Sequence, residues 1–197
     1  MKKRLTVVFA LMAILVLFCS CGKKYNGFKV EGDFIILPLG DELRDEFDLE
    51  TVRVPLFAYK AAEEVLEPVL KDLVAFKPVS ERKLERYADY EDVLYEELDK
   101  QLEAAGLDFE ELTIDLTEDE YDFLEFFIDE FVIEYAWEVC DVLEDVSYYD
   151  DYGYEVKEFF DDCIEDFEEY DAETIKLWFP KLPHLTTYEK TGYAKEN

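Results

Sequence analysis

The chain has 197 residues, of which 50% are hydrophobic and 16% aromatic, and it carries 51 acidic against 20 basic side chains. This length and apolar content suit one folded domain and argue against a disordered acidic chain, because such chains are poor in aromatic residues. Positions 101–175 hold 29 acidic residues and one basic residue, a balance that argues against binding to nucleic acid and favours cations or basic partners.

The N-terminus has the pattern of an export signal. Residues 1–4 are short and basic, and residues 5–18 form a nearly unbroken apolar run that is short for a membrane-spanning helix. The run ends in Leu-Phe-Cys-Ser-Cys-Gly, residues 17–22, which resembles the lipobox of bacterial lipoproteins. The resemblance implies a signal peptide over residues 1–20, a lipid anchor on Cys21, and attachment to the extracytoplasmic face of the cell membrane.

The rest of the chain predicts a mainly α fold: a helical bundle of about four helices with a small N-terminal β element. We expect a lipid-anchored tether over residues 21–27, a single acidic helical domain over 28–180 and an extended tail over 181–197. Residues 28–37 have strand-like composition, and residues 51–54 are the candidate partner strand.

Turn residues divide the segments that follow. Residues 41–50 form a polar connector, and residues 55–76 form a helix that Pro68 is expected to kink or split. A second helix is predicted from Ser80 to Ala105, with Ala105 facing inward and Gly106 as its stop.

The most regular pattern begins at Thr117, which with Glu120 fits a capping box. Apolar residues then recur at steps of three and four in two stripes, typical of a helix in the middle of a bundle. The first stripe is Tyr121, Leu124, Ile128, Phe131, Tyr135, Val139, Val142 and Val146, and the second is Phe123, Phe127, Val132, Ala136 and Leu143. We expect this helix to break between Val146 and Gly153, followed by a helix over residues 154–170 and a last turn at 175–179.

Two cysteines of the predicted domain, Cys140 and Cys163, lie on apolar stripes at similar distances from the predicted turn. In an antiparallel hairpin they could face each other, and an exported protein permits a disulfide between them. The alternative is two buried free thiols that pack as small apolar groups.

Carboxylates also follow helical spacing and define a candidate cation site. The set is Glu155, Glu158, Asp162, Glu165 and Glu169, and a similar stripe comprises Glu118, Asp122, Glu125 and Asp129. Weak binding of Ca²⁺ would relieve the repulsion between like charges, but no EF-hand spacing is present. The alternative, which we favour, is a solvated acidic face.

Tyrosines cluster where the turn after the central helix is predicted. They are Tyr148, Tyr149, Tyr152 and Tyr154. Such clusters are common at recognition surfaces, because rigid amphipathic rings give contact area at low entropic cost. The alternative is that two of these rings pack under the turn and the others have no role.

These patterns predict a non-catalytic lipoprotein that binds a basic protein or peptide through its acidic surface. Weak binding of divalent cations at the cell envelope is the alternative, and an envelope hydrolase with paired carboxylates is a third reading. We do not expect an enzyme or a cofactor, because the chain has one His and lacks nucleophile and phosphate-binding motifs.

Overall fold

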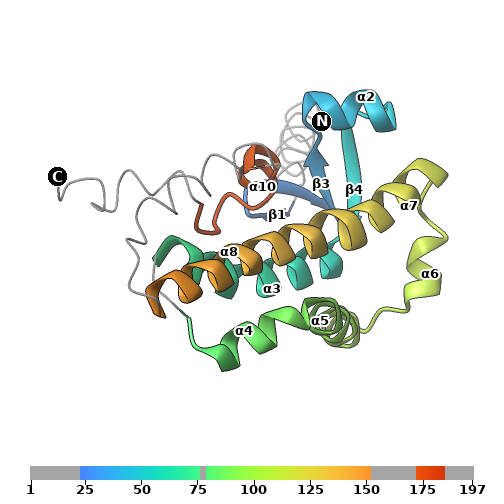
Figure 1. Cartoon of the computed structure of the whole chain (residues 1–197). Coiled ribbons are helices and arrows are strands. Elements are labelled where there is room, and N and C mark those ends of the chain that lie inside the picture. The colour runs from blue at the N-terminus through green and yellow to red at the C-terminus, as the bar shows by residue number, and fades with distance from the viewer. Residues whose placement is uncertain (1–22, 76–78, 152–171, 185–197) are drawn as a thin grey trace, which may run out of the picture.

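The computed structural model describes residues 23–75, 79–151 and 172–184, and Figure 1 shows their arrangement. This part of the chain is mostly helical and has a small antiparallel sheet near its N-terminus, as predicted. The described α-helices range from 5 to 20 residues. The helical class is therefore confirmed, whereas the bundle of about four helices is not.

Four short strands form an antiparallel sheet in the order β1-β2-β3-β4. They are β1 (Lys24–Tyr25), β2 (Phe28–Glu31), β3 (Phe34–Pro38) and β4 (Thr51–Pro55). The stretch predicted as one strand is two, because the chain reverses at Gly32, where φ is 60°. The predicted pairing with residues 51–54 is confirmed: Leu37 lies opposite Val52.

Two segments expected to be irregular contain regular structure. The predicted tether includes β1, which pairs with β2 across the Asn26-Gly27 turn. Both turn residues have positive φ, 52° and 98°, as a two-residue hairpin loop requires. The predicted polar connector contains α2 (Asp41–Phe47), whose Phe47 ring contacts the ring of Phe123 at 5.2 Å between centroids.

The next helix, α3 (Leu56–Ala75), continues through Pro68, so the predicted split is wrong. Pro68 and Glu64 lie on the exposed side of the helix, where water can hydrate the Glu64 carbonyl that lacks a backbone donor. On the opposite side Val65 and Val69 are buried, and α3 packs against α5 and α8. This packing holds the helix together on both sides of the proline.

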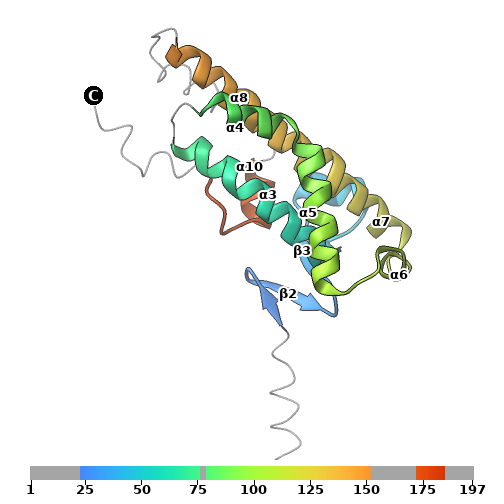
Figure 2. The ribbon, with the colours of Figure 1, turned by 90° about the horizontal axis from the view of Figure 1, so that it is seen from below.

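The helix predicted from Ser80 to Ala105 is two helices that meet at Asp89. They are α4 (Glu81–Ala88) and α5 (Tyr90–Ala105). The chain bends because α4 packs on α8 whereas α5 packs on α3, and Figure 2 shows the change of direction. Gly106 ends α5 as predicted, with φ of 66° and its N–H donated to the carbonyls of Leu102 and Glu103. Ala105 is exposed, so its predicted inward position is wrong.

A short helix, α6 (Phe109–Thr113), leads to the long helix predicted from Thr117. The long helix comprises α7 (Glu118–Glu125), the π-helical segment η1 (Phe126–Ile133) and α8 (Glu134–Asp151). The capping box is confirmed: Glu120 N–H donates to Thr117 Oγ1 at 3.3 Å, and Thr117 N–H donates to Glu120 Oε2 at 3.0 Å. The second apolar stripe is the deeper one, since Phe123 and Phe127 are fully buried while Tyr121 is 38% exposed.

The long helix continues past Val146, so the break predicted there is wrong. Ser147, expected to belong to the turn, donates its hydroxyl to the Leu143 carbonyl at 2.7 Å and accepts from Val79 N–H at 3.1 Å. A serine that bonds its own helix and the segment before α4 is compatible with continued helix. The predicted helix over residues 154–170 lies outside the described residues.

The last described helix, α10 (Ala172–Trp178), confirms the predicted turn near the C-terminus. Trp178 and Phe179 are fully buried, and the Trp178 indole donates to the Pro38 carbonyl at 2.7 Å. The Trp178 ring lies 4.7 Å from the Phe131 ring, so α10 joins the sheet to the long helix. Leu182 is also buried, which places the start of the predicted extended tail on the core.

Candidate functional site

Most of the sites predicted from sequence lie outside the described residues. These are Cys21, Cys163, Tyr152, Tyr154 and the carboxylates Glu155, Glu158, Asp162, Glu165 and Glu169. Tyr148 and Tyr149 belong to the last turns of α8 rather than to a turn, and Tyr148 is 56% exposed. Because Tyr152 and Tyr154 lie outside the described residues, the tyrosine cluster and the cation site both stay predictions.

Cys140 is a buried thiol at the contact between α8 and α4. Its sulfur lies 3.8 Å from the carbonyl oxygen of Tyr87, and burial raises the pKa of the thiol to about 12. The structure holds Cys140 as a free thiol that packs as an apolar group. Because Cys163 is not described, the disulfide stays a prediction.

The clearest surface feature with ligand-binding chemistry is a groove of about 160 Å³ between α5, α6 and the start of the long helix. We call it the aromatic groove. Its lining is Tyr95, Phe109, Tyr121, Leu124, Glu125, Ile128 and Asp129. Three of these residues, Tyr95, Phe109 and Tyr121, are large hydrophobic side chains that remain about two-fifths exposed.

The groove is held open by the way α6 joins its neighbours. Figure 1 shows α6 between the end of α5 and the start of α7. Asp108 caps α6 by accepting from Glu111 N–H at 3.1 Å, and the Phe109 ring meets the edge of Phe57 at 6.3 Å between centroids. These contacts fix the Phe109 wall relative to α3.

The opposite wall is fixed by an ion pair with the sheet. The Arg53 guanidinium on β4 binds Glu120 through two hydrogen bonds of 2.6 Å and donates to the Asp115 carbonyl at 2.7 Å. The Arg53 partner lowers the pKa of the Glu120 carboxyl. Since Glu120 also closes the capping box, one carboxylate ties the first turn of α7 to the sheet.

Carboxylates orient the phenols of the groove. Tyr95 donates its hydroxyl to Asp129 Oδ1 at 2.7 Å, and this hydrogen bond, together with burial, raises the pKa of Tyr95 to about 12. The nearby charge of Glu125 raises the pKa of Tyr121. Both phenols therefore stay protonated at neutral pH, and the groove presents aromatic faces beside two anionic side chains.

The π-helical segment contributes Ile128 and Asp129 to this groove. Its wider turn occurs where the helix serves two surfaces, with Phe127 and Phe131 facing Trp178 in the core and Asp129 facing Tyr95 outside. Short π-helical stretches often accompany functional sites because they redirect side chains. The combination of aromatic faces and carboxylates suits an organic cation, such as an ammonium or guanidinium group.

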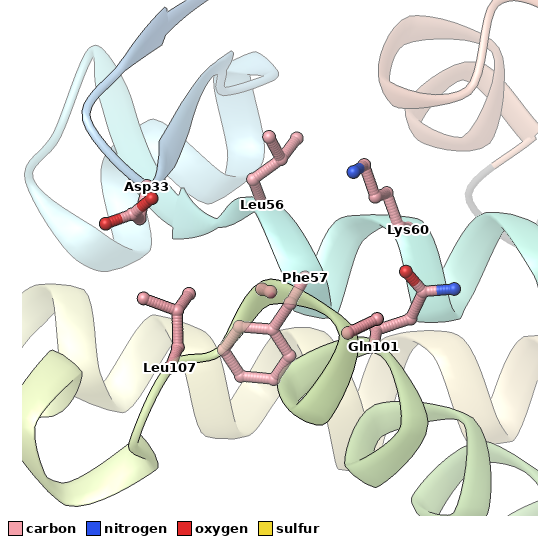
Figure 3. A pocket seen from close by; sticks show the side chains of 8 residues that line it. Asp33, Leu56, Phe57, Lys60, Gln101 and Leu107 are labelled. Carbon is pink, nitrogen blue, oxygen red and sulfur yellow. The ribbon is translucent and has the colours of Figure 1, made fainter.

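A second cavity of about 130 Å³ lies between the β2–β3 turn, the start of α3 and the end of α5. Figure 3 shows Lys60 and Gln101 on one side of it and Asp33 on the other, with Phe57 and Leu107 between them. Its lining carries opposite charges and no exposed aromatic face. It therefore indicates no single class of ligand.

Two searches for other sites apply to the described ranges alone. Within them, no group of three or more His, Cys, Asp or Glu side chains is arranged to hold a metal ion. The same part of the chain has no helix with the length and apolar character needed to cross a membrane.

Comparisons with known proteins do not indicate what the aromatic groove binds. The chain matches no protein-family model, and neither the curated proteins nor the solved structures gave a match.

The sequence indicated only part of the aromatic groove. Glu125 and Asp129 belong to an acidic stripe that the spacing identifies, but the apolar spacing predicts Tyr121 on the buried face. Tyr95 and Phe109 come from other helices, and no local pattern marks them. Only the packing of α5 against η1 and the position of α6 bring these rings together.

Proposed function

We propose that this protein is a non-catalytic lipoprotein, held at the extracytoplasmic face of a membrane by Cys21, that binds a basic protein or peptide. The leader's resemblance to a lipobox supports the anchor, and the excess of acidic residues supports the class of partner. The observation that carries the proposal is the aromatic groove, where Tyr95, Phe109 and Tyr121 surround a cavity bordered by Glu125 and Asp129.

A lysine or arginine side chain of the partner would enter the groove. Its cationic head would lie against the rings of Tyr95 and Tyr121, an interaction that contributes about 0.5–2 kcal/mol. Glu125 and Asp129 would supply charge-assisted hydrogen bonds, and the surrounding acidic surface would speed association. The partner would thus gain affinity from the groove and association rate from the whole surface.

A fluorescent peptide of alternating lysine, arginine and glycine residues is a direct probe, with binding followed by fluorescence anisotropy. The double variant Glu125→Gln/Asp129→Asn is expected to weaken binding by about tenfold or more, because it removes both charges of the groove. Tyr121→Leu is expected to weaken binding through loss of an aromatic face. Thermal unfolding of each variant checks that the fold is retained.

The matched control is Glu144→Gln/Asp145→Asn, which removes the same charge from exposed positions of α8. It is expected to slow the association of the peptide but to change its dissociation constant less than about twofold. Equal weakening by both double variants would show non-specific attraction to the acidic surface and would contradict a binding role for the aromatic groove.

A further inference from the structure

The β1–β2 hairpin is fastened to α3 by a polar cluster around Tyr25. The Tyr25 hydroxyl donates to Glu63 Oε2 at 2.7 Å, and Asn26 Nδ2 donates to Glu63 Oε1 at 2.6 Å. The rings of Tyr25 and Tyr59 meet edge to face at 5.8 Å between centroids. Tyr59 in turn donates to the Trp178 carbonyl at 2.6 Å, so the hairpin and α10 are tied to the same helix.

Two lysines from distant parts of the chain meet at the same ring. Lys60 Nζ on α3 lies 5.6 Å from the centroid of the Tyr25 ring, and Lys181 Nζ, after α10, lies 6.0 Å from it. Neither lysine forms an ion pair with any carboxylate that the structure describes. In a chain with 51 acidic side chains, two unpaired ammonium groups on one tyrosine are unexpected from charge statistics alone.

The hairpin adds three more positive charges at this end of the molecule. Lys24 lies directly opposite Lys29 across the β1–β2 pair, and Lys23 precedes β1. Like charges opposite each other on a β ladder destabilise it, so folding alone does not favour this arrangement. Lys29 is partly neutralised by an ion pair with Glu31, whereas Lys23 and Lys24 have no described carboxylate partner.

Because successive side chains of a strand alternate, Lys24 and Lys29 lie on the face of the hairpin opposite Tyr25, whose ring faces Tyr59. This end of the molecule, with Tyr25 and the lysines 23, 24, 29, 60 and 181, is here called the Tyr25 surface. Lys23 follows Cys21 by two residues, so chain length keeps it within about 7 Å of the anchoring residue. The residues from Gln101 onward, by contrast, hold most of the acidic excess. The protein therefore gathers five lysines and an aromatic ring beside the anchor position, together with the carboxylates of Glu31 and Glu63.

We infer that the Tyr25 surface is the membrane-facing side of the protein and binds the phosphate groups of anionic phospholipids. Each lysine near such a surface strengthens binding about fivefold, and a tyrosine suits the polar headgroup region. At physiological ionic strength the screening length is about 8 Å, so carboxylates beyond this distance repel the membrane only weakly, whereas those of Glu31 and Glu63 offset part of the lysine charge. The inference rests on the anchor in the proposed function.

Vesicle flotation of the unacylated chain from Cys21 to Asn197 tests the inference without the anchor. Every described contact lies within residues 23–184, so removal of the leader deletes none of them. Vesicles of phosphatidylcholine with about one-third phosphatidylglycerol, in about 0.15 M NaCl, are expected to carry the protein upward. Pure phosphatidylcholine vesicles are expected not to do so.

The double variant Lys60→Gln/Lys181→Gln is expected to lower the partition coefficient by about tenfold or more, because two of the lysines are lost. The matched control is Arg82→Gln/Arg86→Gln, which removes two exposed cations from α4 that also lack a described ion pair. This control is expected to stay within about twofold of the native chain. Circular dichroism confirms that both variants are folded.

Three results would overturn the inference: flotation independent of phosphatidylglycerol, equal loss in both double variants, or no flotation of the native chain. Displacement by millimolar inorganic phosphate beyond matched NaCl would assign the surface to free phosphate instead of lipid. Glu125→Gln/Asp129→Asn is expected to leave flotation unchanged. Failure of the peptide-binding proposal is thereby distinguished from failure of this one.

Discussion

At the scale of single residues, Glu120 connects a local signal to the tertiary fold. Its carboxylate closes the capping box with Thr117 and forms a two-pronged ion pair with Arg53 on β4. The Arg53 side chain also lies over the Phe34 ring at 5.0 Å, so the guanidinium is held on two sides. The local pattern predicts the cap, but only the fold reveals the arginine.

Replacing Glu120 with Gln is expected to lower the free energy of unfolding by about 1–3 kcal/mol at neutral pH, because Arg53 loses its charged partner. Arg53 lowers the pKa of the Glu120 carboxyl. The difference between native and variant should therefore be full above the ordinary carboxyl pKa of about 4.3 and decline as the pH falls through the lowered value. Urea unfolding at neutral pH and near pH 3 measures both quantities.

The control is Glu118→Gln, which removes a charge from the same helical turn but from an exposed position that forms no ion pair with the described part of the chain. It is expected to cost less than about 0.5 kcal/mol. If the two variants are equally stable, the ion pair with Arg53 contributes nothing beyond the charge near the helix N-terminus.

At the scale of elements, α10 closes the core although it is only seven residues long. Its Trp178 contacts Phe123, Phe127 and Phe131 on the long helix and donates to Pro38 on the sheet. α10 thus joins three parts of the fold that are far apart in sequence: the long helix, the sheet and, through the hydrogen bond from Tyr59, α3. A short helix with one large buried side chain can therefore carry much of the stability.

Trp178→Ala is expected to lower the free energy of unfolding by about 3–5 kcal/mol, because it leaves a cavity and removes the hydrogen bond to Pro38. The second tryptophan of the chain, Trp137 on α8, is 43% exposed and provides the control. Trp137→Ala is expected to cost less than about 1 kcal/mol. Urea unfolding followed by far-ultraviolet circular dichroism compares them, and similar costs would contradict the role given to α10.

At the scale of the whole molecule, charge is distributed unevenly. The formal net charge is −31, and loss of the basic leader would make the chain more negative still. Self-repulsion of this size destabilises the compact state, particularly at low ionic strength. The aromatic groove lies in the acidic part, whereas the Tyr25 surface collects cations around β1, at the opposite edge of the sheet from β4.

The unfolding temperature is therefore expected to rise as NaCl increases from about 0.01 M to 0.1 M, because the screening length falls from about 30 Å to 10 Å. A parallel series with CaCl₂ at equal ionic strength separates screening from binding. For a solvated acidic face we expect the unfolding temperature to rise equally in the two salts. A larger rise with CaCl₂ would favour the alternative function in cation binding. An unfolding temperature that falls as NaCl increases would contradict the self-repulsion argument.

The errors in the sequence-based prediction share one cause. The helix from Ser80 bends at Asp89, and the long helix passes Ser147, because α4 and α8 pack together and exchange hydrogen bonds near Val79. Pro68 is tolerated because α3 is buried on its opposite side. In each case packing between elements outweighed a local preference of about 1–3 kcal/mol.

The sequence by itself determined the helical class, the strand pairing at residues 51–54, the capping box at Thr117 and the stop at Gly106. These features depend on periodicity and on hydrogen bonds between neighbouring residues, which the order of residues specifies directly. Only the tertiary structure decided the aromatic groove, the Tyr25 surface and the burial of Trp178. Their residues come from separate helices and strands, and burial of apolar surface between those elements brings them together.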